Sequence, residues 1–321
     1  HPPAYMPQNC NLKDVAQVKK VLSIPVVCAG RMEPDVAAEA IKNGEIDAMG
    51  VARQFLTDHH WVTKLMEDRL EDILPCICCH NGCFPFSHYK GIANGGAMQD
   101  TMHMSRCALN PLTMQNHKFD IIPAKKQKTV AVIGGGVGGM ETARIATLRG
   151  HKVTIYEKTD ILGGVFIAAA APSFKEKDRM LLQWYRRQIK NLGIDVKFNT
   201  EIKDLSQIDA DEIVIATGST PKSLPIKGIE NSIEAIEYLN GKEVGQNVVI
   251  IGGGLSGCEI AYDLFLKGKH PIIIEAKNDL MVSNTLCLAN SSYLRDYFDY
   301  KNIPVYLESK VIEINDDSVI I

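Results

Sequence analysis

The stretch KTVAVIGGGVGG, residues 128–139, decides how the second half of this 321-residue chain folds. An apolar run typical of a buried strand leads directly into glycines spaced G-x-G-x-x-G, and a helix-forming segment continues to Gly150. Another apolar strand then ends at Glu157, which stands 23 residues after Gly134. This order predicts a dinucleotide-binding unit, in which the glycines approach a pyrophosphate and Glu157 accepts a ribose hydroxyl.

The same pattern occurs a second time in the chain. GGGLSG at residues 252–257 also stands between an apolar strand and a helix, and Glu275 again follows 23 residues after the first glycine. The likeness extends to residues 193–199 in the first copy and residues 302–308 in the second. We therefore predict two dinucleotide sites built by an internal repeat.

A further buried strand is predicted at residues 211–218, between the two glycine turns. It ends in Ala216-Thr217-Gly218, whose small side chains let the backbone lie against a bound dinucleotide. The second copy reaches a predicted hairpin at residues 314–320 and has no such motif. We therefore expect the sequence to be a piece of a longer chain.

Five of the nine cysteines lie between residues 76 and 107. Cys76, Cys79 and Cys83 are spaced C-x2-C-x3-C, so that three thiolates on one glycine-containing turn can converge while Cys107 arrives from further along. This spacing favours an iron-sulfur cluster. A zinc site would pair two C-x2-C knuckles, and no second knuckle exists; buried unpaired thiols are the third alternative. Cys78 is predicted to point away from the cluster.

The first 75 residues contain two predicted parallel strands, at residues 25–29 and 46–50. Gly30-Arg31 follows the first strand and Ala52-Arg53 follows the second, an arrangement typical of the phosphate site in the last two loops of a TIM barrel. Exposed surface arginines are an equally good interpretation. The predicted helices cover residues 13–22, begin at Pro34, and run from an Asp58 cap to Arg69.

The composition is that of an ordinary globular protein, with 45% apolar and 23% charged residues. A net charge of -3 without a basic run argues against nucleic acid as a partner. The sequence shows neither an initiator Met nor a signal peptide, and no apolar run reaches the ~18 residues that span a bilayer. Together with cysteines clustered for metal binding, this predicts a cytoplasmic protein without a membrane partner.

These motifs resemble the 2,4-dienoyl-CoA reductase and 2-enoate reductase family, old yellow enzyme-like NADH:flavin oxidoreductases with an iron-sulfur cluster. The resemblance covers essentially the whole chain and implies an α/β fold. It places the last two βα units of an FMN-binding TIM barrel at residues 1–75 and a [4Fe-4S] segment with a linker at residues 76–127. The first part of a Rossmann-like FAD domain follows at residues 128–240, and an incomplete NAD(P) domain at residues 241–321.

The resemblance also implies the roles of individual residues. The FMN phosphate would be held by Gly30, Arg31, Ala52 and Arg53, and the [4Fe-4S] cluster by Cys76, Cys79, Cys83 and Cys107. FAD would be bound by Gly134, Gly136, Gly138, Gly139, Glu157, Gly163, Gly164, Thr217 and Gly218. NAD(H) would be bound by Gly252, Gly254, Gly257 and Glu275. The family's catalytic Tyr and His belong to early barrel strands that this sequence lacks, so no catalytic residue is assigned.

The activity implied is reduction of an activated carbon-carbon double bond in an enoate, enone or enoyl-CoA. NADH would deliver a hydride to FAD, and the cluster would pass single electrons to FMN. Amine oxidation of the trimethylamine dehydrogenase type and a non-catalytic electron-transfer module are the alternatives. Glu275 predicts NADH rather than NADPH, although Lys277 lies two residues further on.

Overall fold

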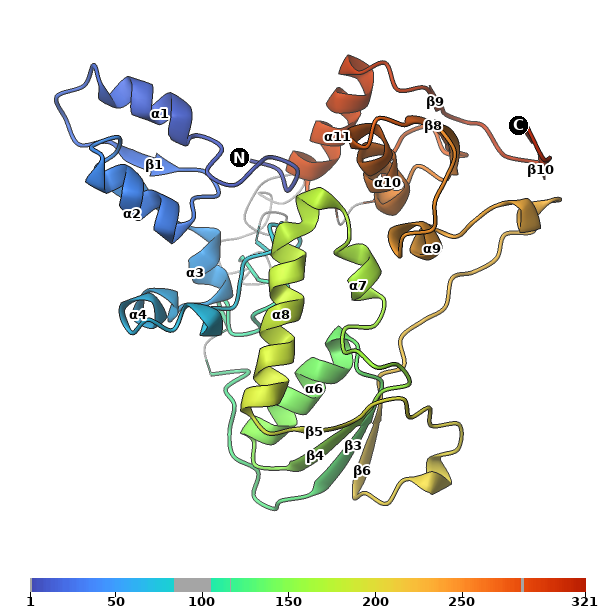
Figure 1. Ribbon diagram of the computed structural model, residues 1–321. Coiled ribbons are helices and arrows are strands. Elements are labelled where there is room, and N and C mark those ends of the chain that lie inside the picture. Colours follow the sequence, from blue (N-terminus) through green and yellow to red (C-terminus); the bar gives the residue numbers. More distant parts are fainter. Residues whose placement is uncertain (1, 84–104, 116, 284–285) are drawn as a thin grey trace, which may run out of the picture. The chain divides into compact units, whose positions relative to one another are not determined.

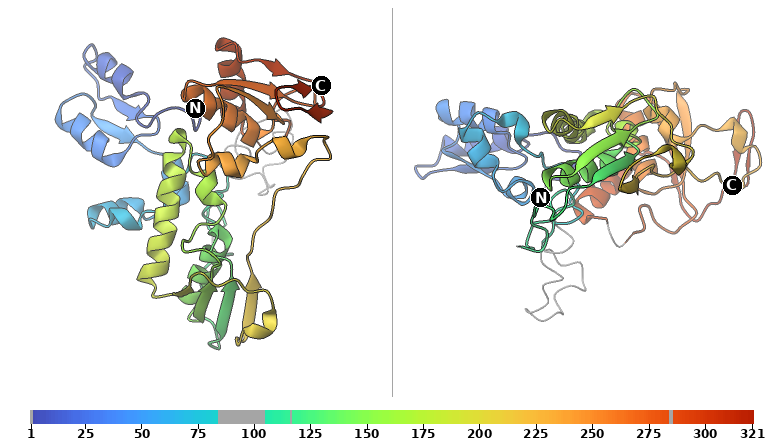
Figure 2. Two further views of the ribbon diagram at one scale, coloured as in Figure 1. Left: turned by 45° about the vertical axis from the view of Figure 1, so that its right-hand side comes forward. Right: turned by 90° about the horizontal axis from the view of Figure 1, so that it is seen from below.

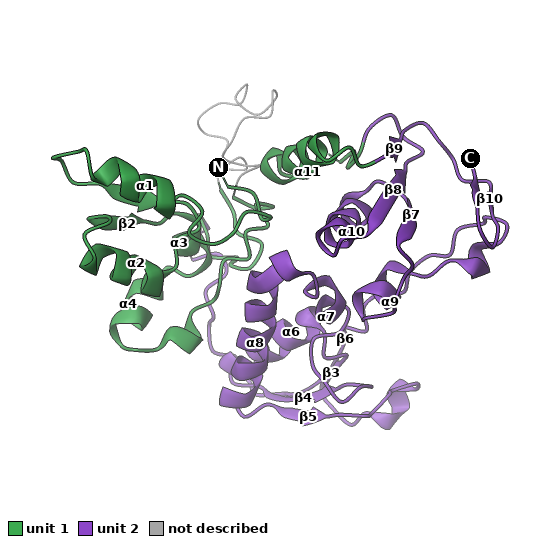
Figure 3. Ribbon diagram, turned by 45° about the horizontal axis from the view of Figure 1, so that its top comes forward, with its two compact units in different colours: residues 1–114, 280–303 green, residues 115–279, 304–321 purple. Residues whose placement is uncertain are grey.

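The computed structural model describes residues 2–83, 105–115, 117–283 and 286–321. It has the predicted α/β character and divides into two compact units (Figures 1 and 3). Unit 1 comprises His1–Met114 and Leu280–Ile303, and unit 2 comprises Gln115–Asp279 and Pro304–Ile321. No helix in the described part of the chain is long and apolar enough to cross a membrane.

Unit 1 contains the two strands predicted near the N-terminus. Strands β1 (Val27–Ala29) and β2 (Ala48–Gly50) are parallel, and Ala29 lies opposite Gly50. Both strands therefore end at the same edge of their sheet. Helices α1 (Leu12–Lys19) and α2 (Pro34–Lys42) alternate with them, and Pro34 occupies the first turn as predicted. The core between these elements consists of Cys28, Ala40 and Ile46.

The prediction of one helix from Asp58 to Arg69 was wrong. The chain forms two short helices instead, α3 (Arg53–Thr57) and α4 (Trp61–Met66), followed by the single turn η1 (Leu70–Asp72). Asp58 lies between the helices because its buried carboxylate serves three partners. It accepts hydrogen bonds from Lys64 Nζ at 2.6 Å, Leu74 N at 3.0 Å and His60 N at 3.1 Å.

Unit 1 also receives a helix from late in the sequence, α11 (Leu288–Tyr300). Its Asn290 side chain accepts a hydrogen bond from Ala4 N at 2.9 Å, and Tyr293 stacks on Tyr5 with ring centroids 5.5 Å apart. This long-range pairing has no signal in the sequence.

The first glycine-turn repeat of unit 2 contains a four-stranded parallel sheet in the order β5-β4-β3-β6. Helix α6 packs against β3 and β4, and the long helix α8 packs on α6 (Figure 2). The buried residues of α8 include Leu181 and Trp184. The strands are β3 (Thr129–Ile133), β4 (Lys152–Tyr156), β5 (Asp195–Lys197) and β6 (Glu212–Ile215). The helices are α6 (Val137–Leu148), α7 (Phe166–Ala169) and α8 (Glu176–Asn191), with single turns η4 (Ser173–Lys175) and η5 (Leu205–Gln207).

The second glycine-turn repeat of unit 2 has the same arrangement with fewer strands. Its sheet has the order β7-β8-β9, and helix α10 packs against β7 and β8. The predicted C-terminal hairpin is present, and its apolar residues form a small core with Ile274. The strands are β7 (Asn247–Ile251), β8 (His270–Ile274), β9 (Val305–Tyr306), β10 (Glu313–Ile314) and β11 (Val319–Ile320). The helices are α9 (Ala235–Leu239) and α10 (Leu255–Leu266), preceded by the turn η6 (Ile229–Asn231).

Candidate functional site

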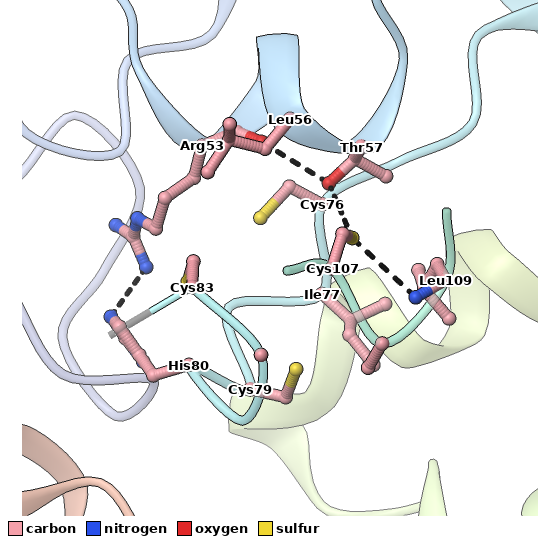
Figure 4. A pocket seen from close by; sticks show the side chains of 12 residues that line it. Arg53, Leu56, Thr57, Cys76, Ile77, Cys79, His80, Cys83, Cys107 and Leu109 are labelled. Atoms are coloured by element: carbon pink, nitrogen blue, oxygen red, sulfur yellow. Dashed lines mark hydrogen bonds between the residues drawn. The ribbon is translucent and has the colours of Figure 1, made fainter. Parts of the chain in front are cut away.

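The four cysteines predicted as cluster ligands line one pocket in unit 1, and their side chains surround the same space (Figure 4). They are Cys76, Cys79, Cys83 and Cys107. Cys78 is not among the lining residues; its thiol lies 3.7 Å from the carbonyl oxygen of Cys76. In the described residues, no three His, Cys, Asp or Glu side chains stand together as a site for a single metal ion.

The backbone around Cys79 has an unusual conformation. Cys78 and His80, on either side of it, have φ angles of +56° and +59°, in the left-handed region that residues other than glycine seldom adopt. Each such residue costs about 1–3 kcal/mol, which the surrounding structure must offset. Alternation with left-handed residues turns successive N–H groups toward one side, which forms the concave anion sites seen at many iron-sulfur clusters. The cysteine segment therefore fits a negatively charged cluster.

Cys107 reaches the pocket because the chain returns against Gly82. Arg106 N donates a hydrogen bond to Gly82 O at 2.9 Å, and a Cβ on Gly82 would lie 2.7 Å from Arg106 O. Only glycine leaves room for this close approach. The long insertion before Cys107, residues 84–104, lies outside the described residues, but the two ends that carry Cys83 and Cys107 are joined by this contact.

Helix α3, which follows strand β2 in the chain, supports the pocket through hydrogen bonds. Gln54 donates to Leu74 O at 2.8 Å and accepts from Cys76 N at 2.9 Å, which fixes the start of the cysteine segment. At the other end of the helix, the Leu56 carbonyl accepts hydrogen bonds from the side chains of Asn110 and Thr113, at 3.0 and 2.6 Å. Helix ends leave carbonyl groups without intrahelical partners, and these two side chains satisfy one of them.

Two buried polar residues line this pocket, Thr57 and His80, and His80 has 1% of its surface exposed. Burial, and then the charge of Arg53, lower the pKa of His80 to about 4, so the ring is neutral near pH 7. Its Nε2 therefore accepts a hydrogen bond from Arg53 Nη1 at 2.6 Å. The pKa of Cys76 is raised well above its usual value by a hydrogen bond with Cys78 and by burial. A metal that binds Cys76 must displace this proton.

The four residues predicted to hold the FMN phosphate follow the carboxyl ends of β1 and β2, so their loops are neighbours at one sheet edge. Gly30 needs its φ of +130°, and a Cβ there would lie 2.5 Å from the Asn11 side chain. The guanidinium groups have other partners, however. Arg31 donates to the carbonyl oxygens of residues 3, 4 and 6, whereas Arg53 donates to His80. Ala52 immediately precedes helix α3.

The first glycine turn in unit 2 joins β3 to α6. Gly134 has a φ of +104°, and a Cβ there would lie 2.4 Å from Ala216 O, at the end of β6. A Cβ on Gly139 would lie 1.9 Å from Gly134 O. Both glycines are therefore required by packing. Beside this turn, Gly163 N donates to Gly135 O at 2.8 Å, and Gly164 packs against Gly136.

Two glycines of the same turn have no such explanation. Gly136, at the start of α6, has ordinary extended angles of -69° and -179°, and a Cβ on Gly136 or Gly138 would meet no atom of the described residues within 4 Å. Gly254, at the start of α10, repeats this, with angles of -68° and 178° and open space beside it. The fold of the protein alone does not require glycine at these places. The space beside the two helix starts fits the pyrophosphates of two dinucleotides.

The predicted ribose-binding glutamates lie at equivalent positions. Glu157 Oε2 accepts from Gly135 N at 2.7 Å, and Glu275 Oε2 accepts from Gly253 N at 2.6 Å. Glu157 is buried, and its other oxygen accepts two hydrogen bonds from Thr159. The other oxygen of Glu275 accepts one, from Lys277 N at 2.8 Å. Glu275 therefore has the larger remaining capacity to accept a hydroxyl.

A pocket of about 460 Å³ opens beside the second glycine turn, and Gly252 and Glu275 line it. Its size falls within the range of small-molecule sites. The other sides are mainly apolar, with one cation, Lys310. The apolar lining residues include Leu224, Pro225, Ile226, Val311 and Ile312.

Several positioning residues were not predicted from the sequence. Gln54 and Thr57 contact the cysteine segment from α3, and Asn290 Nδ2 lies 3.5 Å from Cys79 O. These contacts join residues that are far apart in the chain. His80 had one signal, its place within C-x2-C-H-x2-C, but the sequence does not reveal its partner Arg53.

Comparison with known proteins gives a family and several similar proteins. Residues 110–207 and 203–320 match the model of the family described as pyridine nucleotide-disulphide oxidoreductase. The cinnamate reductase of Clostridium sporogenes is 36% identical over 326 residues, which cover 100% of this chain and 47% of that protein.

Two of the similar solved structures illustrate matches over 99% of this chain. A 2-naphthoyl-CoA reductase in complex with 2-naphthoyl-CoA has a TM-score of 0.85 and 31% identity, with 47% of its chain covered. The histamine dehydrogenase from Rhizobium sp. 4-9 has a TM-score of 0.80 and 23% identity, with 48% of its chain covered. This chain thus spans about half the length of the relatives it matches.

Two dinucleotide-binding units in tandem define a class of protein, the flavoproteins that use FAD together with NAD(P)H. The chain belongs to the pyridine nucleotide-disulphide oxidoreductase family. The predicted resemblance to the 2-enoate and 2,4-dienoyl-CoA reductases is confirmed by the cinnamate reductase and 2-naphthoyl-CoA reductase matches.

Proposed function

We propose that this chain is the electron-transfer part of an NADH-dependent enzyme that reduces an activated carbon-carbon double bond. The observation that carries the proposal is that four cysteines line one pocket, in a chain that also contains two glycine turns of the dinucleotide-binding type. The names of the similar proteins support an enoate or an enoyl thioester as the substrate class.

The cofactors proposed are NAD(H), FAD, a [4Fe-4S] cluster and FMN, which together convert the two-electron chemistry of NADH into single-electron steps and back. The protein's own residues bind and orient these groups. Cys76, Cys79, Cys83 and Cys107 supply four thiolates. The loops after β1 and β2 supply backbone groups for the FMN phosphate, with Arg31 and Arg53 as the nearby cations.

Each of the two glycine turns in unit 2 is proposed to bind a different dinucleotide. The turn at Gly134–Gly139, closed by Thr217 and Gly218, binds FAD, and the turn at Gly252–Gly257 binds NAD(H). We further propose that the FAD domain covers residues 128–240 and the NAD(P) domain residues 241–321. The 460 Å³ pocket at Glu275 would then receive the adenosine of NADH.

Glu275 sets the expected preference for NADH. A carboxylate that accepts the ribose hydroxyl repels a 2'-phosphate, whereas the two lysines nearby, Lys277 and Lys310, would attract one. Glu275→Ala should therefore weaken NADH binding and reduce the preference for NADH over NADPH, measured as the ratio of their dissociation constants. An unchanged ratio of the dissociation constants would show that another group determines the preference for NADH.

The test of the function is direct. Protein purified without oxygen should be brown and contain about four irons per chain. With FAD and FMN added, mixing with NADH should bleach the flavin absorbance. The complete protein should then reduce cinnamate or an enoyl-CoA, and should not oxidise dimethylamine. Amine oxidation without NADH consumption would favour the dehydrogenase alternative, and electron transfer without either reaction would favour a non-catalytic module.

A further inference from the structure

Helix α3 contacts the cysteine pocket through two side chains that the sequence predictions did not connect with it. Arg53 and Thr57, one turn apart on the helix, both line the pocket (Figure 4). The Arg53 guanidinium is held by His80 Nε2 at 2.6 Å. Thr57 Oγ1 lies 3.5 Å from the sulfur of Cys107.

The hydrogen bond between Thr57 and Cys107 has one direction once a cluster is bound. In the free thiol form either atom can donate, and Thr57 Oγ1 also lies 3.2 Å from Arg53 O, to which it can give its proton. A Cys107 that ligates iron is a thiolate and has no proton. In a hydrogen bond between the two side chains, Thr57 is then the donor and the sulfur is the acceptor. Leu109 N, at 3.4 Å, is a second donor to the same sulfur.

We propose that Arg53 and Thr57 are positioning residues that raise the reduction potential of a cluster bound in this pocket. The inference rests on the proposed function, because it assumes an iron-sulfur cluster on the four cysteines. It assigns to the Arg53 side chain a role beside the cluster, in addition to the place of its backbone in the phosphate loop.

The physical reason is charge. Reduction adds one electron to the cluster without a proton, so the reduced form carries one more negative charge than the oxidised form. The electron comes from one flavin of the proposed function and leaves to the other. A fixed cation at the pocket wall and a hydroxyl donor to a ligand sulfur both stabilise the more negative form. His80 Nε2 accepts the Arg53 hydrogen bond at 2.6 Å, so it keeps the cation in place.

The experiment compares charge-removing variants with matched controls. Arg53→Gln removes the cation and Arg53→Lys keeps it; Thr57→Val removes the hydroxyl at nearly constant shape and Thr57→Ser keeps it. Each protein is purified anaerobically, its iron is counted, and the midpoint potential of the cluster is measured by reductive titration followed by electron paramagnetic resonance.

We expect all four variants to retain iron. Arg53→Gln should lower the equilibrium constant for one-electron reduction about tenfold, which is about 59 mV for a one-electron couple. Thr57→Val should lower it about threefold. The two conservative variants should stay within about twofold of the wild type.

Retained iron with unchanged potentials in Arg53→Gln and Thr57→Val would overturn the inference and leave the proposed function intact. Loss of iron in both variants would also overturn it, because the residues would then hold the cluster rather than tune it. If only Arg53→Gln lost iron, the midpoint potential of Thr57→Val would decide. A lower potential than in the wild type would support the inference, and an unchanged potential would overturn it. A wild-type protein without iron would instead contradict the proposed function itself.

Discussion

Gly136 illustrates, at the scale of the residue, how a ligand site is recognised in a protein without its ligand. Its backbone angles suit any residue, and in the described structure the position that a Cβ on Gly136 would take is open. Gly134, two positions earlier, has both a left-handed backbone and a close neighbour in Ala216. One glycine therefore serves the fold, and the other fits a bound pyrophosphate.

This difference gives a prediction with its own control. Gly136→Ala should leave the free energy of unfolding within about 1 kcal/mol of the wild type, yet weaken FAD binding at least tenfold, because the new methyl group occupies the space of the phosphates. Gly134→Ala should destabilise the fold by about 2 kcal/mol or more. Denaturant unfolding and flavin titration measure the two effects. Normal FAD binding by Gly136→Ala would show that the pyrophosphate does not lie against this residue.

The cysteines allow a second test at the same scale. Cys79→Ser should abolish iron binding, because one of the four thiolates that line the pocket is lost. Cys78→Ser should retain iron, since the Cys78 thiol faces the carbonyl oxygen of Cys76. Iron analysis and the visible spectrum of anaerobically purified variants measure both. Stoichiometric zinc without visible absorbance would contradict the cluster.

At the scale of the element, helices α9 and α10 are joined by a buried polar contact. Tyr238 donates a hydrogen bond of 2.6 Å to Asp263, which also pairs with Lys267 at 2.6 Å. Lys267 in turn lies over the Tyr238 ring, 5.0 Å from its centroid. The Asp263 side chain is 2% exposed, so these partners are needed to stabilise its charge.

Tyr238→Phe should lower the free energy of unfolding by about 1.5–3 kcal/mol, the usual contribution of a hydrogen bond to a charged group. Tyr300→Phe is the matched control, because Tyr300 is 76% exposed, and should change stability by less than about 0.5 kcal/mol. Urea unfolding near pH 7 measures both. Equal effects of the two substitutions would mean that the buried contact contributes nothing.

The same contact predicts a pH dependence. Burial, and then the hydrogen bond with Asp263, raise the pKa of Tyr238 to about 12, from an ordinary value of 10.0. The folded protein therefore holds this proton more tightly than the unfolded chain. Its contribution to stability is complete below pH 10 and is lost as the pH rises from 10 to about 12. The stability difference between the wild type and Tyr238→Phe should narrow over that interval in unfolding curves recorded at each pH.

At the scale of the whole molecule, the sheets differ in how completely their strands are paired. The two larger sheets of unit 2 precede glycine turns, and the sheet of unit 1 has two described strands. Strand β3 lies between β4 and β6, and its residues from Val130 to Ile133 are buried. Among the described residues, β1 pairs with β2 alone, and Val27 is 60% exposed. A strand with a free edge and an uncovered face opens more easily.

Hydrogen exchange on this polypeptide should reflect that difference. The amides of Val27–Ala29 should exchange much faster than those of Thr129–Ile133, and residues 1–75 should be the least protected region. FMN should bind weakly to this region, since two phosphate loops do not enclose the flavin ring. Protection of Val27–Ala29 equal to that of Thr129–Ile133 would contradict the prediction.

Pairing also explains why the two repeats are not equivalent. In the first copy, β6 lies beside β3 and its end approaches Gly134. In the second copy, no described strand pairs with the corresponding edge of β7, and a Cβ on Gly252 would meet no described residue within 4 Å. The sequence already indicated this difference, because the second copy has no counterpart of Ala216-Thr217-Gly218.

The sequence by itself determined the local units of this protein. Apolar runs, glycine spacing and the two glutamates predicted the βαβ units correctly, because strand, turn and helix are fixed by residues within about 25 positions of one another. The C-x2-C-x3-C spacing likewise required three of the cysteines to lie on one turn. These features depend on short stretches of chain whose geometry varies little.

Only the tertiary structure decided the contacts between distant stretches. The approach of Cys107 depends on Gly82, the direction of the Arg53 side chain depends on His80, and Asp58 became a buried acceptor rather than a helix cap. In each case a polar group has several possible partners along the chain. The partner it takes is set by which groups are buried together, and burial without a hydrogen bond costs more than any local preference can return.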